Sequence, residues 1–450
     1  MPTRTWLSAF ILAVLVPTAL SVPAGAQTVA VDAELLRQLQ ELVQQQQEQL
    51  GAQAETIEAL KSRVDQLEQR STETQNIATE AQSTAEKAFD TAEKTSAGQL
   101  PDKVITSGQE KIKLAISGQL NRATNIADDG DETRAYFVDN DTSNSRVRFV
   151  GTGQVTPETT LGTTVEIAFS PNNSFDVSQD NEQADDFIDL RKVEGSARND
   201  SLGRLLFGKG AAAADDTAEY DLSLVAGPIM YSGVADIAGG LEFLDDGVGS
   251  GVTVGDAFFN FDGNRQDRVR YDSPVFGPGV QLAVSAGSDQ RYDAALTWGG
   301  DYGDWTGVDI GEVSTLGALS IQEPNADNVR WRLAGSYSIL HNPTGLSLTV
   351  SGGMDSKNRG DDPYNLYGKL GWDTSFFQFG PTGFGVDYTF SQDVSADGDE
   401  GMSVGFAAIQ LIEDFGTELY AQVRIYDLDR DNAASVDDIV VGTVGTRIKF

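Results

Sequence analysis

The chain contains no cysteine and only one histidine, His341, among its 450 residues. Without cysteine it can form no disulfide and offers no thiolate nucleophile, which fits a bacterial exported protein that folds without disulfides. His341 lies in the turn sequence His341-Asn342-Pro343, where a catalytic base is not expected. The sequence also lacks a Ser-centred nucleophile elbow, so we do not expect an enzyme.

Positive charge and long apolar runs are scarce as well. The 32 Lys and Arg residues face 68 Asp and Glu residues, and the net charge of −36 would repel nucleic acid. An apolar run from Trp6 to Val16 follows Arg4 and precedes Ala24-Gly25-Ala26, which predicts a secretory signal peptide over residues 1–26. No later stretch approaches about 18 consecutive apolar residues, so no membrane-spanning helix is expected.

Residues 27–100 carry a heptad pattern, which predicts an α-helical coiled coil. One seam position holds Leu36, Val43, Leu50, Ile57 and Val64, and the other holds Leu39, Leu60 and Leu67, with Gln46 and Gln53 as polar interruptions. Sixty residues in one helix would span about 90 Å. A solitary helix or a disordered Gln-rich tether is the alternative. Gly98 and Pro101 then end the helix.

From Pro101 onward the hydrophobic period changes to 2. Val269 and Tyr271 alternate with Arg268 and Arg270, for example, and similar segments of about 9 to 13 residues recur to the C-terminus. A soluble sandwich would also alternate, but its strands would be shorter, about 5 to 6 residues, and its apolar face would point inward. Residues 101–450 are therefore predicted to be an all-β transmembrane barrel with lipid outside and water inside.

The connections between these segments alternate in length, which supports the barrel. Short turns are predicted at 157–160, 198–201, 275–278, 299–304, 341–344, 379–382 and 413–416. Longer acidic loops are predicted at 121–144, 171–185, 210–266, 323–328, 355–362, 391–401 and 427–438, with a short link at 288–290. The count is about 16 antiparallel strands. It could differ by two, because the ninth, near 307–321, is poorly patterned.

The longest connection, residues 210–266, is too long for a simple loop between strands. It keeps apolar anchors that a linker would not need: Tyr220, Leu222, Ile229, Met230, Tyr231, Phe243, Phe258, Phe259 and Phe261. We expect it to fold against the inside of the barrel and to narrow the channel there.

Two motifs imitate ligand sites. Gly203 to Gly210 nearly matches a phosphate-binding loop but lacks the Ser or Thr that would hold magnesium. Asp427, Asp429, Asp431 and Asp438 imitate a calcium loop, but its Gly and its bidentate Glu are both absent. No cofactor and no specific metal site are expected, although loose divalent binding in this acidic loop would help to bridge lipopolysaccharide.

Four segments together resemble the trimeric Gram-negative porin family. They are Asn144 to Gly151, in which Arg148 replaces the usual Gly; Leu205 to Lys209, in which Lys replaces Arg; Arg268 to Pro274; and Gly445 to Phe450. Their order and spacing cover most of residues 110–450. The coiled coil resembles a subgroup with a periplasmic coiled coil, some of whose members favour dicarboxylates.

The resemblance implies an inward loop whose acids face a ladder of basic wall residues, three barrels in one particle, and a terminal Phe450 that the barrel-assembly machinery reads. Arg146 and Arg191 match the ladder, and Lys209 substitutes within it. By strand parity the basic wall also includes Arg148, Arg268, Arg270, Arg330, Arg332, Lys369, Arg424, Arg447 and Lys449. The candidate loop acids, by position, are Asp215, Asp216, Glu219, Asp221 and Asp236.

We therefore expect an outer-membrane porin for passive diffusion of small hydrophilic solutes, with its coil in the periplasm. Basic wall residues would raise the local anion concentration, while acidic loops would favour cations, so charge preference stays open with a lean towards anions such as dicarboxylates. The alternative is an envelope tether whose barrel anchors a coil that engages peptidoglycan. Expected partners are two further copies of the chain, outer-membrane lipid and lipopolysaccharide.

Overall fold

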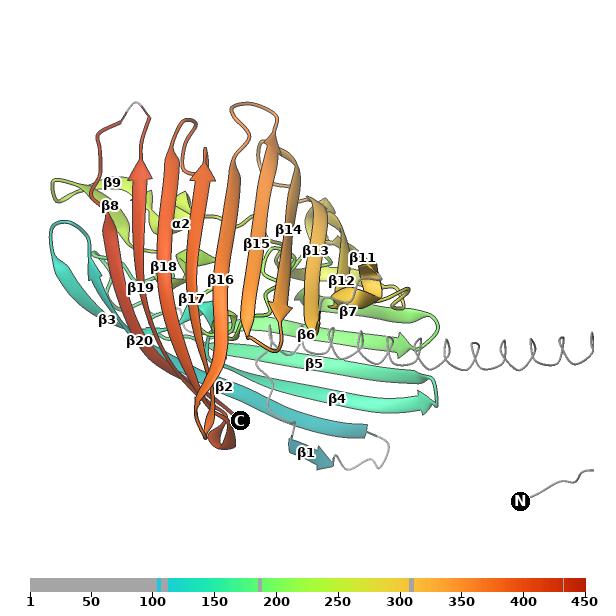
Figure 1. Cartoon of the computed structure of the whole chain (residues 1–450). Coiled ribbons are helices and arrows are strands. Elements are labelled where there is room, and N and C mark those ends of the chain that lie inside the picture. The colour runs from blue at the N-terminus through green and yellow to red at the C-terminus, as the bar shows by residue number, and fades with distance from the viewer. Residues whose placement is uncertain (1–102, 107–111, 185–187, 307–310, 432) are drawn as a thin grey trace, which may run out of the picture. The chain divides into compact units, whose positions relative to one another are not determined.

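The computed structural model describes residues 103–106, 112–184, 188–306, 311–431 and 433–450. The predicted signal peptide and coiled coil lie outside the described residues. The described part forms one closed antiparallel barrel (Figure 1).

Sixteen strand positions close the barrel. They are β2 (Ile112–Asp128), β3 (Thr133–Asp139) with β4 (Arg146–Thr156), β5 (Thr159–Phe169), β6 (Ile188–Asn199), β7 (Gly203–Ala211), β10 (Arg265–Asp272), β11 (Val280–Gly287), β12 (Tyr292–Asp301), β13 (Val313–Glu323), β14 (Val329–His341), β15 (Leu346–Lys357), β16 (Tyr364–Phe377), β17 (Gly380–Gln392), β18 (Glu400–Ile412), β19 (Thr417–Asp429) and β20 (Ile439–Lys449). Each pairs with the next, and β20 returns to β2. This confirms the predicted barrel and its strand count.

The second strand position is built from two pieces, which corrects one predicted loop. β3 pairs with the second half of β2 and β4 with the first half, and the short 3-10 helix η1 (Asp141–Ser143) lies between them. Residues 121–144, predicted as a long loop, are therefore mostly strand, and only residues 129–132 form the turn. The acidic run from Asp128 to Glu132 coincides with the turn. The flanking strands contain many polar residues, and these were interpreted as part of the loop.

The barrel closes where its last strand meets its first. Gly118 and Phe450 exchange two backbone hydrogen bonds, of 2.8 and 2.9 Å. β1 (Lys103–Thr106) pairs with β2 at residues 113–116, just beyond the point where β20 ends. β1 and the C-terminal strand β20 therefore pair with successive parts of the same edge of β2.

Side chains alternate across the wall except at bulges such as those in β6 and β14. Val444 is 65 % exposed on the outer face, whereas its neighbour Thr443 is buried on the inner face. Large apolar residues are exposed around the outside, including Phe207, Leu366, Phe406 and Val423, and this apolar band is what a barrel presents to lipid.

No helix among the described residues is long and apolar enough to cross a membrane.

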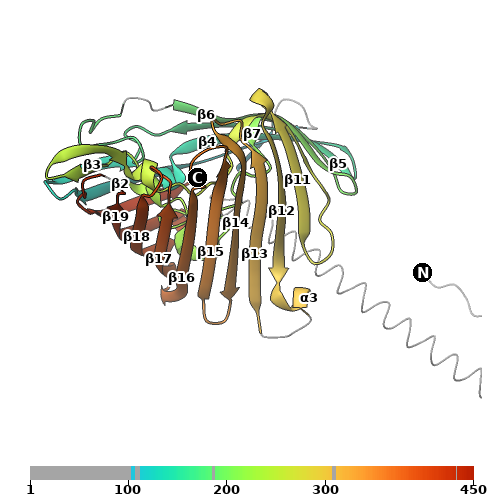
Figure 2. The ribbon, with the colours of Figure 1, turned by 90° about the horizontal axis from the view of Figure 1, so that it is seen from above.

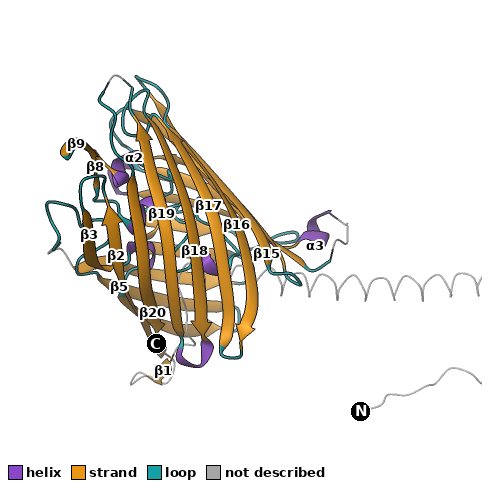
Figure 3. Cartoon of the chain, turned by 60° about the vertical axis from the view of Figure 1, so that its left-hand side comes forward, coloured by secondary structure: helices purple, strands orange, loops and turns teal. Residues whose placement is uncertain are grey.

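Short turns gather at one end of the barrel, together with the C-terminus, and the longer connections gather at the other (Figures 1 and 3). The predicted alternation is therefore confirmed. The poorly patterned ninth strand is β13, which begins at Val313 rather than near 307, after the short helix α3 (Tyr302–Thr306). Among the long connections, residues 212–264 run across the interior of the ring of strands instead of standing above it (Figure 2).

This inward loop contains short elements of its own. They are η2 (Leu224–Ala226), η3 (Val234–Ile237), β8 (Glu242–Asp245), β9 (Val248–Thr253) and α2 (Val254–Ala257). A capping box of Thr253 and Asp256 begins α2. The predicted boundaries, 210–266, agree with the observed loop within two residues at each end.

Gly118 gives a test of the closing seam. A Cβ at Gly118 would stand 2.7 Å from the carbonyl oxygen of Arg146 and 2.7 Å from the Phe450 ring. We expect Gly118→Ala to lower the free energy of unfolding by about 1–3 kcal/mol, because backbone cannot move aside cheaply. Gly442, across the same seam, has its nearest atom at 3.8 Å and is the matched control. Equal urea midpoints for Gly118→Ala and Gly442→Ala in detergent would contradict this account.

Candidate functional site

The inner wall of the barrel has two chemically different parts, which the alternation rule alone does not predict. Inward positions of β2, β3 and β18 to β20 contribute a cluster of buried apolar side chains, including Val138, Ile409, Tyr426, Ile439 and Val441. Inward positions of β4, β6, β7 and β10 supply eight basic side chains to one cavity. The inward loop lies against the apolar part.

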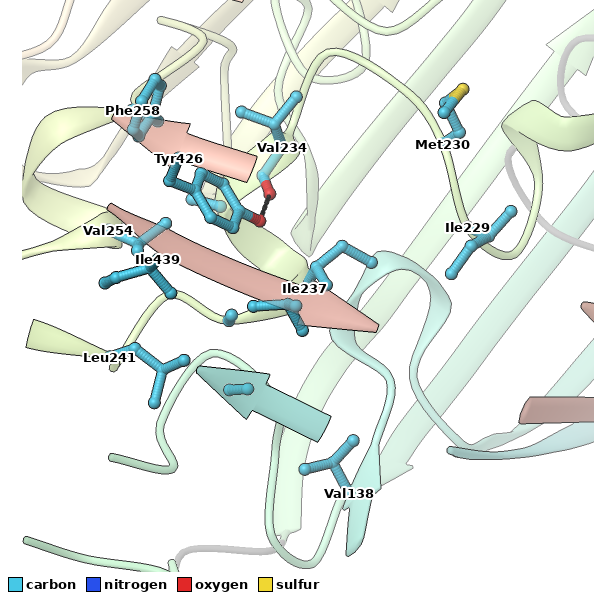
Figure 4. Close-up of a cluster of buried hydrophobic side chains, with 14 of the residues drawn as sticks. Val138, Ile229, Met230, Val234, Ile237, Leu241, Val254, Phe258, Tyr426 and Ile439 are labelled. Atoms are coloured by element: carbon cyan, nitrogen blue, oxygen red, sulfur yellow. Dashed lines mark hydrogen bonds between the residues drawn. The ribbon is translucent and has the colours of Figure 1, made fainter. Parts of the chain in front are cut away.

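Apolar packing holds the loop there (Figure 4). Loop residues Val234, Ile237 and Phe258 share one buried cluster with wall residues Tyr426 and Ile439. The rings of Phe258 and Tyr426 are 5.5 Å apart, and the Tyr426 hydroxyl donates to the Val234 carbonyl at 2.7 Å. Each large side chain buried in this way contributes about 1.5–3 kcal/mol.

Hydrogen bonds trace the path of the loop along the wall. On the outward leg the amides of Ala213, Tyr220 and Leu222 donate to Ser285, Ser336 and Ser338 on β11 and β14. At the far side Asn125 of β2 donates to the Ile237 carbonyl at 2.7 Å. On the return leg Ser391 of β17 donates to the Ala257 carbonyl. The wall of β4 to β7 lies outside this path, so the remaining passage runs beside it.

Three predicted basic wall residues anchor the loop. Lys369 donates to the Met230 carbonyl at 2.8 Å and pairs with Asp221 at 2.5 Å, with both side chains buried. Arg447 donates to the Gly227 carbonyl at 3.1 Å and pairs with Glu418. Arg332 pairs with Asp355 and lies 4.7 Å from the centre of the Phe259 ring. Their charges are therefore compensated inside the structure.

On the basic side, three arginines surround one carboxylate. Glu166 of β5 is 1 % exposed and lies 2.5 Å from Arg148, 2.8 Å from Arg191 and 3.7 Å from Arg146. The group carries two more positive charges than negative ones. Glu166 holds these guanidinium groups, including those of Arg146 and Arg191, in place on one wall.

Two further pairs extend this wall. Arg268 pairs with Glu194 at 2.5 Å and donates to the Ala211 carbonyl at 2.9 Å. Arg270 and Arg204 share the buried Asp272, at 2.7 and 2.9 Å. Arg270 also donates to the Ala212 carbonyl at 2.6 Å, which fixes the start of the inward loop.

Lys192 and Arg265 belong to the same wall but were not predicted. A bulge in β6 leaves Arg191 without a partner on β5, so Arg191 and Lys192 both lie between the outward-facing Leu190 and Val193. Counted back from the inward-facing Glu194, alternation turns Lys192 inward, and the bulge lets its neighbour Arg191 face inward as well. Arg265 is the first residue of β10, where parity gives little guidance.

Two connected cavities lie between the loop and this wall. One, of about 170 Å³, is lined by eight basic and four acidic side chains. The other, of about 340 Å³, is lined by three basic and seven acidic side chains. Arg146, Arg191, Arg265, Asp215 and Asp216 line both. Positive and negative charge therefore face each other across the passage.

The five predicted loop acids all line the acidic cavity. Asp262, which was not predicted, joins Asp215 and Asp216, and the carboxylates of these three residues lie within 4.8 Å of one another. That spacing could accommodate a divalent cation, but Asp262 already accepts the amides of Asp216 and Ala218 at 2.7 Å. It therefore also holds the turn of the loop.

Burial weakens the acidity of this cluster. Burial, and then neighbouring carboxylates, raise the pKa of Glu219 and Asp262 well above the usual range, and raise the pKa of Asp216 as well. Burial, followed by repulsion from Asp141, raises the pKa of Asp236 to about 7, against a hydrogen bond from Tyr231 that lowers it. At neutral pH the cavity carries less negative charge than its seven carboxyl groups suggest.

The other predicted basic residues lie away from these cavities. Arg424 is buried against Asp387 at 2.6 Å, and Lys449 pairs with Glu418. Arg330 sits at a bulge of β14, exposed, and donates to the Lys357 carbonyl. Lys209 lies opposite Asp267 and Val193, on the outer face, because it has the same strand parity as the outward-facing Leu205 and Phe207. It does not belong to the inner ladder.

The structure thus defines a class: a sixteen-stranded β-barrel of the outer membrane whose charged interior is narrowed by its own loop. The chain belongs to the Gram-negative porin family, whose model matches residues 85–439. A search of curated proteins gives no match.

Three solved structures show the same fold. An anion-selective porin from Comamonas acidovorans is 13 % identical, with a TM-score of 0.52 over 75 % of this chain and 100 % of that one. OmpT of Vibrio cholerae, folded in vitro, and Salmonella typhi OmpF in complex with daunomycin are each 12 % identical, with TM-scores of 0.50 over 77 % of this chain and 100 % of theirs.

Lys369→Met tests the anchoring of the loop. Removing the ammonium leaves Asp221 buried without its cation, so we expect the free energy of unfolding to fall by about 3–5 kcal/mol. The double variant Lys369→Met/Asp221→Asn should recover part of this loss, because the stranded charge is gone. Urea titration in detergent measures the change in stability, and protease cleavage within residues 212–264 measures how far the loop is released from the wall. Lys113→Met, at an exposed site of β2, is the control, and an equal loss there would contradict the anchor.

Proposed function

We propose that this outer-membrane channel passes small hydrophilic solutes by passive diffusion and favours anions. The observation that carries the proposal is the pair of oppositely charged cavities beside β4 to β10. A permeating solute is not enclosed by apolar groups and meets no catalytic constellation among the described residues. It meets a field directed across the passage instead.

The anion preference rests on unequal ionisation of the two sides. Guanidinium groups stay charged at any ordinary pH, whereas several loop carboxyls have raised pKa values. The basic wall should therefore outweigh the acidic loop near neutral pH. A dicarboxylate, with two negative groups, would gain more from this wall than a monovalent anion.

We further propose that three copies associate. The wall of one barrel encloses its own cavities, so each copy would conduct independently. In a planar bilayer under a potassium chloride gradient at pH 7, we expect current steps in groups of three and a chloride-favouring reversal potential. A cation-favouring potential would show that the acidic loops determine the charge preference. Absence of current steps would contradict the channel proposal and favour the envelope tether.

The charge preference should depend on pH. Asp236 has a pKa raised to about 7, so it is charged above that pH and becomes neutral below it. As pH falls from 8 to 5, the negative side of the passage loses charge while the arginines keep theirs. We expect the reversal potential to shift towards chloride, with a midpoint near 7. The Asp236→Asn variant should show a much smaller pH-dependent shift of the reversal potential. An unchanged shift in this variant would mean that other groups cause the pH dependence.

A further inference from the structure

A groove of about 660 Å³ lies in the outer face of the barrel, over the neighbouring strands β13 to β16 (Figure 1). Gly335 of β14 and Gly352 of β15 lie opposite each other, so two outward positions on its floor carry no side chain. Leu319, Val350 and Leu366 form its sides, and each is about half exposed. The groove is therefore apolar and open to the lipid around the barrel.

Aromatic rings line the groove on the side of the short turns. Trp298 of β12 and Tyr337 of β14 stack there with their ring centres 6.3 Å apart. Trp298 also covers Gly317, the outward glycine at that level of β13, whereas Gly335 and Gly352 stay uncovered. The groove therefore runs from these rings along the wall towards the long loops.

An exposed arginine lies beyond the other end of the groove. Arg330 is the extra residue of a bulge in β14, which lets Arg330 and its neighbour Trp331 both face outward, between Val329 and the inward-facing Arg332. Arg330 donates to the Lys357 carbonyl at 2.8 Å. Because its side chain is exposed, its remaining N–H donors are available to a ligand.

Other charged groups at this end of the barrel are of both signs. Lys357 pairs with Asp397 at 3.7 Å, and Asp362 accepts the amide of Lys357 at 2.6 Å. Arg359 and Asp361 are both exposed on the loop between β15 and β16. The net field at Arg330 is therefore small, and an anionic group would be held there chiefly by charge-assisted hydrogen bonds.

The spacing of the arginine and the groove matches the dimensions of one lipid. Arg330 is three residues from Leu333, where the groove begins, and seven residues from Tyr337, which is about 24 Å along an extended strand. With a strand tilt of about 40°, this is about 18 Å along the membrane normal. One leaflet with its headgroups is about 20 Å thick. A headgroup at Arg330 would therefore place its acyl chain in the groove.

We propose that this groove binds one phosphorylated lipid of the leaflet on the long-loop side, which in a Gram-negative outer membrane is lipopolysaccharide. One acyl chain lies on the floor at Gly335 and Gly352, and a phosphate accepts hydrogen bonds from Arg330. A guanidinium group can donate two parallel hydrogen bonds to a phosphate.

The shape of the groove favours a lipid over a second copy of the chain. A flexible acyl chain can follow a narrow groove and contact its floor. The convex wall of another barrel would bridge the sides and leave the glycines without contacts, which forfeits dispersion energy. The site lies on the outer face, so it does not depend on the proposed solute passage.

The experiment counts bound lipid by native mass spectrometry. Purified full-length protein is freed of lipid in detergent and titrated with diphosphorylated lipid A. We expect one tightly bound lipid A for each barrel. Gly352→Leu fills the floor and Arg330→Gln removes the phosphate donor, and each should weaken binding about tenfold. Arg330→Lys should recover only part of the affinity, because an ammonium group cannot form the paired hydrogen bonds.

Two variants serve as matched controls. Gly442→Leu adds the same side chain at an outward position of the distant strand β20, where the nearest atom to a Cβ is 3.8 Å away. Arg198→Gln removes an exposed arginine at the short-turn end of β6. Both should bind lipid A as the wild type does. Arg330 lies at an exposed bulge, so Arg330→Gln keeps the test decisive if Gly352→Leu folds poorly.

Three results would overturn the proposal. One is wild-type affinity in both Gly352→Leu and Arg330→Gln. Another is equally tight binding of lipid A from which both phosphates have been removed, because Arg330 would then have no role. The third is a changed number of copies in the Gly352→Leu particle with unchanged lipid A binding, which would make the groove an interface between copies.

Discussion

The contact between the inward loop and the apolar part of the wall is the constraint on which the rest of the site depends. Because residues such as Ile237 and Phe258 pack against Tyr426 and Ile439, the loop lies against β2, β3 and β18 to β20. The passage is left on the opposite side, beside the arginine-rich wall. If only hydrogen bonds to the wall held the loop, its position would be poorly fixed, because water in the lumen competes for each of those hydrogen bonds.

Fixing the loop also divides the basic residues into two groups. Lys369, Arg332 and Arg447 are satisfied by loop carbonyls, loop aromatics or neighbouring carboxylates, and they act as structural anchors. In the group around Glu166, three arginines share one carboxylate, so the group has a net positive charge, and it faces a cavity. Basic side chains that alternation places on the same inner face can therefore have different electrostatic roles, because each role depends on which groups of the loop or wall the side chain contacts.

The barrel itself was largely readable from the sequence. Period-2 alternation over long segments, short turns at one end and longer acidic loops at the other predicted sixteen strands and an inward loop, and the structure has both. The errors have different origins. Residues 121–144 were taken for a loop because their strands are polar. Lys192 was missed because strict alternation lets only one of two consecutive residues face inward, whereas the bulge at Arg191 lets both do so. Lys209 was assigned to the ladder by the family resemblance, although its parity with Leu205 and Phe207 places it on the outer face.

The sequence by itself determined the all-β class, the side of the wall that faces lipid and the approximate limits of the inward loop. It could do so because these depend on local periodicity and on burial of apolar groups, which neighbours along the chain express. Only the tertiary structure decided which acid meets which base. Asp221 and Lys369 are far apart in sequence, as are Glu194 and Arg268, and the closure of the barrel and the path of one loop bring them together.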